Sequence, residues 1–344
     1  MALRVLVVFG GPSSEHEVSR MSAQGVGASL AQAGCDVVYA EVDRDGRWRS
    51  GGEYLDPFGA GRPGVDVVFP LIHGPFGEDG SLQGLLEWCG VPYVGSDVVG
   101  SAVAIDKAVM KTVLSAAGLP AVRWCLVHRH ELADGREVLE RCEALGDYPR
   151  FVKPARLGSS VAVSKVRSDA ELLAALASAA RYDERVLVEE GVRARELECA
   201  ILGGRPPRAS AVGEIRHRRE FYDYTAKYDA GAGTRLDIPA RVEEGVAAQV
   251  RALAVAAFEA CAARDLARVD FFLTDDGRLL VNEINTLPGF TPYSMYPLLW
   301  QASGMSPAEL ALALVQAAAA RGPRPRREAD AGEGGTSARP EAAR

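Results

Sequence analysis

The stretch Arg268-Val269-Asp270-Phe271-Phe272-Leu273-Thr274-Asp275-Asp276-Gly277-Arg278-Leu279-Leu280-Val281-Asn282-Glu283-Ile284-Asn285 decides how this chain is interpreted. Two apolar runs flank an Asp-Gly turn signal, which predicts a β-hairpin. Pairing of the two strands would bring Asp270, Glu283 and Asn285 to one end of the hairpin, beside Arg268. Three hard oxygen ligands at one point suit Mg²⁺, which combines a few carboxylates with phosphate oxygens. The stretch therefore predicts nucleotide-dependent chemistry.

The composition is that of an ordinary globular protein, with 344 residues, 48% hydrophobic and 25% charged. This length favours two or three subdomains. A net charge of −7 argues against a nucleic-acid-binding protein, which usually has a basic face. The six cysteines are scattered without a C-x-x-C pair, so we expect buried thiols rather than disulfides or a zinc site. The apolar run 5–9 is too short for a signal peptide, and charges interrupt the most apolar helical stretch, 246–263. We expect no membrane span and a cytoplasmic location.

The order of the expected elements divides the chain into four parts. Residues 1–105 alternate strands with helices, which predicts a parallel sheet covered by helices. Residues 106–190 and 191–321 are expected to form two further units, and residues 322–344 a disordered tail with little to bury. Strands are expected at 3–9, 36–42, 65–72, 91–94, 122–127, 150–153, 161–166 and 185–189, and helices at 18–33, 82–89, 170–180, 307–320 and from Asp106 to about 118.

Three stretches outside the hairpin have the composition of binding segments. Lys153 and the loop Gly158-Ser159-Ser160 offer an ammonium group and backbone N–H groups to a phosphate, although alone they are more often an ordinary surface turn. The run 186–192 is predicted to be a strand entering a linker. Such a run is usually a buried strand with solvated acidic ends, and this interpretation competes with that of a binding segment. The loop 10–19 lacks the G-x-G-x-x-G pattern and carries carboxylates that would repel a pyrophosphate. It suits an ammonium group instead.

Together these motifs resemble those of the D-alanine–D-alanine ligases of the ATP-grasp superfamily. The resemblance covers about residues 5–320 and rests on Gly-Gly-x-Ser-x-Glu-His-Glu-Val-Ser at 10–19, the loop 151–161 and the stretch 268–291. It implies an α/β fold of the ATP-grasp type, in which an N-terminal parallel α/β domain precedes two α+β subdomains that clasp ATP. Two positions, Arg156 and Ala162, depart from the commoner loop pattern Asn-Leu-Gly-Ser-Ser-Val-Gly; Ala162 could stiffen the loop, and the effect of the two residues on loop closure stays open.

The resemblance also implies a nucleotide site. Glu189 would accept a hydrogen bond from the adenine amine, backbone groups near Glu190 and Val192 would read the purine edge, and Glu196 would hold the ribose. An ionised glutamate suits the ribose because it accepts from two donors. Lys107 would contact phosphate, with a solvated surface lysine as the competing interpretation. The full set implied for ATP is Lys107, Lys153, Glu189, Glu190, Val192, Glu196 and Lys227. Two Mg²⁺ ions, which Mn²⁺ could replace, would bind Asp270, Glu283 and Asn285.

The substrate and catalytic residues follow from the same resemblance. Glu15 would hold the amine of the first D-alanine, and His73, unless it is merely structural, would lie near its carboxylate. Ser294 and the Met295 backbone would bind the carboxylate of the second D-alanine. The polar stretch 216–235 resembles a mobile loop in which Lys227 faces the phosphates. The catalytic residues implied are Glu15, Ser159, Tyr228, Arg268 and Gly289, with Arg268 and Gly289 forming the oxyanion site and Tyr228 linked through Ser159 toward Glu15.

The implied activity is ligation of two D-alanines through an acyl phosphate, for peptidoglycan precursor synthesis. Tyr228 favours D-alanine as the second substrate, because relatives that use D-lactate commonly have Phe or His there. Two alternatives stay open. One is a D-Ala-D-Ser or D-Ala-D-lactate ligase of the same fold, and the other is a catalytically inactive ATP-binding regulatory protein. The expected partners are small molecules and a second copy of the chain in a homodimer, without nucleic acid or membrane.

Overall fold

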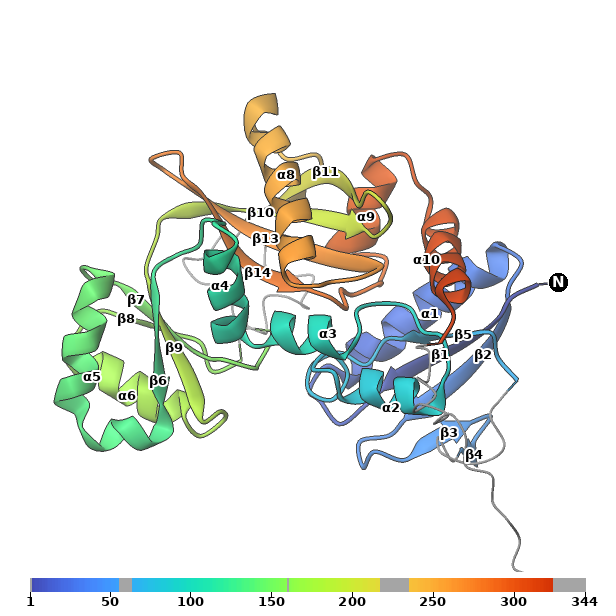
Figure 1. The fold of residues 1–344 in the computed structure, drawn as a ribbon, viewed down its shortest axis with the longest axis horizontal. Helices are drawn as coiled ribbons and strands as arrows, with labels where there is room; N and C mark the ends of the chain where they lie inside the picture. Colours follow the sequence, from blue (N-terminus) through green and yellow to red (C-terminus); the bar gives the residue numbers. More distant parts are fainter. Residues whose placement is uncertain (1, 56–63, 160, 217–234, 324–344) are drawn as a thin grey trace, which may run out of the picture.

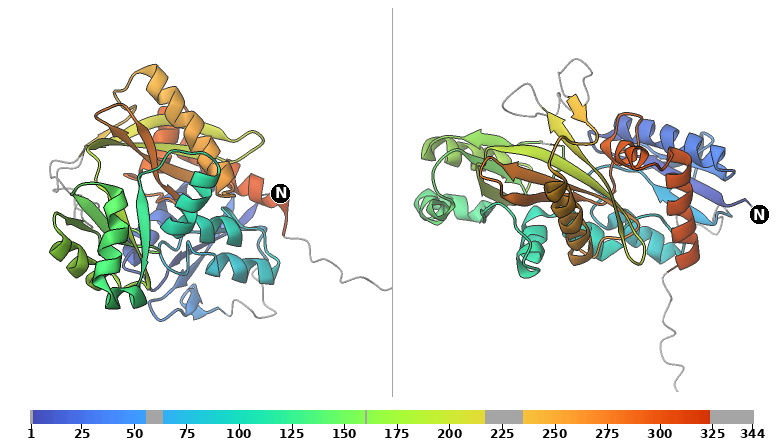
Figure 2. Two further views of the ribbon diagram at one scale, coloured as in Figure 1. Left: turned by 60° about the vertical axis from the view of Figure 1, so that its left-hand side comes forward. Right: turned by 90° about the horizontal axis from the view of Figure 1, so that it is seen from above.

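The computed structural model describes residues 2–55, 64–159, 161–216 and 235–323. Within these residues the strands form three sheets in chain order, which we call the first, second and third sheets. Seen from above, the first and second sheets lie at opposite ends of the molecule with the third between them (Figure 2). The expected tail, 322–344, lies outside the described residues from 324 onward.

The first sheet has the order β4-β3-β2-β1-β5, and β1 pairs in parallel with both β2 and β5, as predicted. No strand forms at 91–94, where a single parallel bridge joins Tyr93 to Val68. The run is short because Gly90 and Gly95, both at positive φ, bound it closely. The elements of this unit are β1 (Arg4–Gly10), α1 (His16–Gln32), β2 (Asp36–Val42), β3 (Trp48–Ser50), β4 (Glu53–Tyr54), β5 (Val67–Pro70), α2 (Ser81–Cys89) and α3 (Val98–Ile105).

The second sheet has the order β6-β9-β7-β8 with antiparallel pairs, and α5 and α6 lie on one side of it (Figure 1). The strand predicted from 161 begins only at Ser164, because Ala162 has a φ of 56°, which is incompatible with a strand. The carboxylate of Asp106 accepts hydrogen bonds from the N–H groups of Ala108 and Val109 and so starts α4, as predicted. The elements are α4 (Lys107–Ala116), β6 (Trp124–His128), α5 (Gly135–Cys142), β7 (Arg150–Pro154), β8 (Ser164–Val166), α6 (Asp169–Ala179) and β9 (Arg185–Glu190).

The third sheet is antiparallel, has the order β12-β11-β10-β13-β14 and is covered by α8 (Figure 1). Its central strand β10 pairs along its whole length with β13, the first strand of the predicted hairpin. The elements are β10 (Ala194–Leu202), β11 (Arg208–Arg216), β12 (Arg235–Asp237), α8 (Glu244–Ala260), β13 (Leu266–Thr274), β14 (Leu279–Asn285), α9 (Met295–Ala302) and α10 (Pro307–Arg321).

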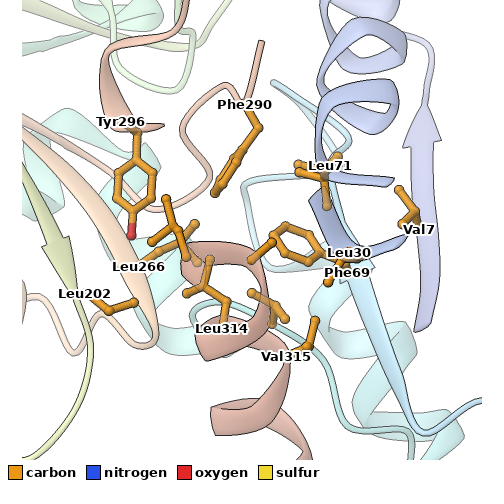
Figure 3. Packing of buried hydrophobic residues seen from close by; sticks show 14 of the residues in the cluster. Val7, Leu30, Phe69, Leu71, Leu202, Leu266, Phe290, Tyr296, Leu314 and Val315 are labelled. Carbon is orange, nitrogen blue, oxygen red and sulfur yellow. The ribbon is translucent and has the colours of Figure 1, made fainter. Parts of the chain in front are cut away.

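One hydrophobic core joins the first sheet to the C-terminal part of the chain. The ring of Phe290 packs against Phe69 of β5 at 5.6 Å and against Tyr296 of α9 at 5.3 Å between centroids. Leu314 and Val315 of α10 lie in the same cluster beside side chains from α1 and β5 (Figure 3). The last helix therefore fixes the position of the first sheet relative to the third.

Two expectations from composition can be compared with the structure. All six cysteines lie within the described residues and are free thiols, as predicted, but only Cys142, Cys199 and Cys261 are buried, whereas Cys35, Cys89 and Cys125 are half-buried. In the part of the chain that the structure describes, no helix is long and apolar enough to cross a membrane.

Candidate active site

The predicted hairpin forms and aligns the three predicted metal ligands. In the β13–β14 register Asp270 lies opposite Glu283, and Arg268 lies opposite Asn285. The Asp-Gly turn closes through a hydrogen bond from the Gly277 N–H to the Thr274 carbonyl at 2.9 Å. The hairpin therefore brings two carboxylates, one amide and one guanidinium to the end opposite the turn.

Arg268 is clamped between two carboxylates. Its Nε and Nη2 donate to the two oxygens of Asp270 at 2.7 Å each, and its Nε lies 3.0 Å from Glu198 Oε2. Burial acts to lower the pKa of Arg268, but the charges of Asp270 and Glu198 raise it well above its ordinary value. Glu198 lies on β10, directly opposite Asp270. The guanidinium is thus charged and fixed in orientation.

The oxygens at this end fit a hard divalent cation. Asn285 Oδ1 accepts from the Leu287 N–H at 2.9 Å, which orients the amide, and Glu283 Oε2 lies 3.8 Å from Lys107 Nζ. Among the described residues, no three or more His, Cys, Asp and Glu side chains are grouped so that they could hold a metal ion. Two carboxylates and an amide are a partial set, which suits an ion that also takes phosphate oxygens. The residues present therefore fit Mg²⁺ bound together with a nucleotide.

A buried cluster of two lysines and one glutamate, the lysine-rich cluster, lies on the second sheet; here cations outnumber carboxylates. Lys153 of β7 and Lys111 of α4 flank the carboxylate of Glu189 on β9, with N–O distances of 2.6 and 3.1 Å. Glu189 is 3% exposed and Lys111 is 0% exposed. Burial acts to raise the pKa of Glu189, but the charges of Lys111 and Lys153 outweigh it and lower the pKa. Glu189 is therefore ionised and held between two cations.

Lys107 connects this cluster to the hairpin. Its ammonium donates to the Leu157 carbonyl at 2.8 Å and lies 3.8 Å from Glu283 Oε2. The residue is 8% exposed, so the competing interpretation of a solvated surface lysine is wrong. One side chain thus contacts both the loop after β7 and the predicted metal ligands.

The loop after β7 reaches the first sheet. Ser159 Oγ donates to Glu15 Oε1 at 2.5 Å, so the predicted link between these two residues forms. Ser159 and Ala162 both have positive φ, 52° and 56°, a region that is strained for side chains other than glycine. At the other end of the loop, Arg156 donates from its backbone N and from Nη2 to Asp183, at 2.9 and 2.6 Å. The unusual Arg156 therefore anchors the loop.

His73 lies near Glu15 at the end of the first sheet and is 4% exposed. Its Nδ1 is 3.6 Å from Glu78 Oε1, and its Nε2 is 3.2 Å from Ser22 Oγ. Burial acts to lower the pKa of His73, but the hydrogen bond and charge of Glu78 and the charge of Glu15 raise it overall. This environment favours an imidazolium, which could attract a substrate carboxylate.

The loop that follows the hairpin meets the same region. The Phe290 N–H donates to Ser22 Oγ at 3.2 Å, and a Cβ on Gly289 would lie only 2.8 Å from Ser294 Oγ. Ser294 Oγ accepts from the Thr291 N–H at 3.0 Å, and α9 begins at Met295. The predicted oxyanion and second-carboxylate residues are therefore adjacent to one another, and Ser22 connects this loop to His73.

In the linker between the second and third sheets, Glu190 is hydrogen-bonded to Arg123. The Glu190 N–H donates to the Arg123 carbonyl at 3.0 Å, and the Glu190 carboxylate accepts from Arg123 N and Nε at 2.8 Å each. The N–H and the carboxylate of Glu190 are therefore both engaged by Arg123. Val192 follows in the linker, and Glu196 lies on β10 opposite Phe272. A surface hollow lined by residues 190–193, 274–276 and 278 lies at the turn end of the hairpin, away from the predicted metal ligands.

Sequence reasoning missed three residues of this site: Glu78, Lys111 and Glu198. Lys111 carries a usable signal, because residues four apart on a helix share a face and Lys107 is a predicted phosphate contact. Glu78 lies in the same Gly-rich stretch as His73. Glu198 is two residues after Glu196, and only strand pairing reveals its contact with Arg268. Lys227 and Tyr228 lie outside the described residues.

Comparisons with known proteins agree with this geometry. Residues 113–316 match the family model described as D-ala D-ala ligase C-terminus, and residues 4–60 and 57–96 match the N-terminus model. The chain is 43% identical to D-alanine--D-alanine ligase A of Chromobacterium violaceum, covering 93% of this chain and 96% of the relative. It is 45% identical to the D-alanine--D-alanine ligase of Deinococcus radiodurans, covering 92% and 99%.

Solved structures give the same result. The structure of the D-alanine-D-alanine ligase from Coxiella burnetii has a TM-score of 0.82 and 36% identity, covering 93% of this chain and 94% of that one. The VanG D-Ala:D-Ser ligase from Enterococcus faecalis has a TM-score of 0.81 and 30% identity, covering 92% and 100%.

Proposed function

The chain belongs to the D-alanine–D-alanine ligase family, and from this premise we propose how its residues join two D-alanine molecules at the expense of ATP. It is an enzyme with the predicted ATP-grasp fold, and its product D-alanyl-D-alanine is a peptidoglycan precursor. One observation supports the site most strongly. Lys107 lies between the lysine-rich cluster of the second sheet and the acidic end of the hairpin, 3.8 Å from Glu283. Phosphates and a cation would find complementary partners at this junction.

In the first step, the carboxylate of one D-alanine attacks the γ-phosphorus of ATP, which gives an acyl phosphate and ADP. Glu15 would accept hydrogen bonds from the ammonium group of this D-alanine. His73, with its raised pKa, would sit near the carboxylate and limit its repulsion from the triphosphate. Lys107 and Lys153 would bind phosphate oxygens, as ammonium groups commonly do. The bond from Ser159 to Glu15 would keep the loop beside the reacting groups.

For the metal, we propose that Asp270, Glu283 and Asn285 bind two Mg²⁺ ions, which Mn²⁺ could replace. When bound, the metal would neutralise charge on the transferring phosphoryl group. The hydrogen bond that orients Asn285 and the closeness of Asp270 and Glu283 across the hairpin support this assignment.

In the second step, the amine of the other D-alanine attacks the acyl carbonyl and phosphate leaves. Arg268 and the Gly289 N–H would stabilise the oxyanion, and one such donor is typically worth about 2.7–4 kcal/mol. The clamp on Arg268 supports this role, because a fixed cation needs no reorganisation as charge develops. Ser294 and the Met295 N–H would bind the second carboxylate at the start of α9.

For the other nucleotide contacts, we propose that Glu189 accepts from the adenine amine, that Glu190 and Val192 offer backbone groups, and that Glu196 binds the ribose. Lys227 and Tyr228 keep their predicted roles toward the phosphates and Glu15. The homodimer and the cytoplasmic location are likewise proposals from the family resemblance. D-alanine is the favoured second substrate, because the relatives that are 43% and 45% identical over most of this chain are named D-alanine--D-alanine ligases.

The test is phosphate release from ATP and Mg²⁺ with D-alanine alone, and with D-alanine paired with D-serine or D-lactate. Products are identified by mass. We expect release with D-alanine alone and formation of the dipeptide. Turnover only with a mixed pair would favour another ligase of the same fold, and ATP binding without turnover would favour an inactive protein.

A further inference from the structure

Lys111 of α4 has no part in the mechanism above, although it is the most deeply buried cation of the site. Its side chain is 0% exposed, and its ammonium lies 3.1 Å from Glu189 Oε1. Burial acts to lower the pKa of Lys111, which reflects the energy needed to keep a charge in this position. An ammonium group buried in this way is costly unless a partner compensates it.

The position of Lys111 prevents direct contact with a nucleotide. It approaches one oxygen of Glu189, while Lys153, with a side chain 12% exposed, approaches the other at 2.6 Å. If Lys153 were the sole cation at this buried carboxylate, much of its charge would be offset by Glu189. A second cation on the protein side of Glu189 removes that loss, because opposite charges at short range in the interior interact strongly.

A second contact fixes Lys111 in place. The Asp106 carboxylate, which caps α4, also forms an ion pair with Arg185, the first residue of β9. The helix that carries Lys111 and the strand that carries Glu189 are therefore tied together at two points, Asp106 with Arg185 and Lys111 with Glu189. Such a double connection holds the ammonium at one oxygen of the carboxylate.

We infer that Lys111 is a positioning residue that neutralises Glu189 from its buried side, so that Lys153 keeps its charge for the phosphates of ATP. The inference rests on the proposed function of Lys153 and Glu189. Lys111 would also keep the Glu189 carboxylate oriented, so that its remaining lone pairs can accept from the adenine amine.

The experiment is a double-mutant cycle with Lys111→Met, Glu189→Gln and the double variant, in which KM for ATP, KM for D-alanine and kcat are measured. We expect Lys111→Met alone to raise KM for ATP at least about tenfold, because Lys153 would be left as the sole cation paired with the buried Glu189 carboxylate. KM for D-alanine should stay within about twofold, because the cluster lies away from Glu15 and His73. In the Glu189→Gln background, the added Lys111→Met change should alter KM for ATP less than about threefold.

The cycle separates the possible failures. If Lys111→Met has the same effect with and without the Glu189 carboxylate, Lys111 does not act through Glu189 and the inference is overturned. If Lys111→Met alone does not fold, a large rise in KM for ATP from Glu189→Gln to the double variant would still overturn the inference, because Lys111 would then act without the carboxylate. Met110→Ala, a buried change on the same helix, is the control and should lower stability without raising KM for ATP. A wild-type protein inactive with ATP and D-alanine would refute the proposed function instead.

Discussion

The hairpin end of the third sheet and the interior of the second sheet each hold a central charged group between two groups of opposite charge, but the signs are reversed. At the hairpin end, the Arg268 guanidinium lies between the carboxylates of Asp270 and Glu198, with Glu283 nearby. In the second sheet, the Glu189 carboxylate lies between the ammonium groups of Lys111 and Lys153. One region has an excess of carboxylates and the other an excess of cations.

The comparison shows how a site can be prepared for a nucleotide and its metal separately. An excess of carboxylates attracts a divalent cation, and an excess of ammonium groups attracts phosphates. In each region the central group is held by both neighbours, so its orientation is fixed before a ligand binds, which favours catalysis. The following changes test whether the two regions have these distinct roles.

The largest effect is expected from removing charge at the hairpin end. Asp270→Asn or Glu283→Gln should lower kcat by a factor on the order of 10³ or more while the fold is retained, because metal-ion stabilisation of developing charge is worth several kcal/mol. Dipeptide formation and circular dichroism provide the measurements. Glu259→Gln, the same charge change at an exposed position on α8, is the control. Turnover close to that of the wild type would remove the metal assignment.

A smaller effect is expected when Arg268 loses one of its two anchors. Glu198→Gln leaves the bidentate contact with Asp270 but removes one charge 3.0 Å from Nε. We expect kcat to fall about tenfold with KM for ATP nearly unchanged, because an interaction made mainly in the transition state is weakened. Steady-state kinetics with ATP varied at saturating D-alanine measures both values. An increase in KM for ATP at constant kcat would place Glu198 in nucleotide binding instead.

The third prediction concerns pH and the first sheet, which lies outside both charged regions. The folded-state pKa of His73 is raised, so its protonation stabilises the folded protein at pH below the unfolded value of about 6.5. This contribution should be lost as the pH rises through the folded-state pKa. The free energy of unfolding of the wild type and of His73→Gln, measured by denaturant titration from pH 5 to 9, should therefore differ by an amount that declines with pH. A constant difference would mean that the His73 charge does not contribute.

The smallest effect is expected at Ala162. A left-handed conformation costs a residue with a Cβ roughly 1–2 kcal/mol, and glycine loses roughly 0.5–1 kcal/mol through its greater freedom in the unfolded chain. Ala162→Gly should therefore raise the free energy of unfolding by no more than about 1.5 kcal/mol. Gly158→Ala is the matched control, since a Cβ added to Gly158 would meet no other atom within 4 Å and Gly158 is not among the residues at positive φ. A clear loss of stability in Ala162→Gly would show that the strain is compensated elsewhere.

Local signals carried most of what could be predicted from the sequence. The hairpin, the start of α4 at Asp106 and the positions of β2 and β9 depend on residues close together in the chain, so composition and turn chemistry were sufficient. Lys111 and Glu198 could not be assigned from their neighbours in sequence. Their partners, Glu189 and Arg268, reach them only when strands or a helix from distant segments pack together. The strand expected at 91–94 is absent for a local reason, because Gly90 and Gly95, both at positive φ, closely bound the apolar run.

The hydrophobic cores also divide the molecule in a way that bears on its unfolding. The buried core between the second sheet and helices α5 and α6 is drawn from residues 127–188, whereas the core around Phe69 and Phe290 draws on segments from residue 5 to residue 318. The second sheet with α5 and α6 can therefore open as a cooperative unit of its own, while both ends of the chain must unfold together. Hydrogen exchange should show two protection classes along the chain. ATP bound between the second and third sheets should make the degrees of protection of the two classes more similar.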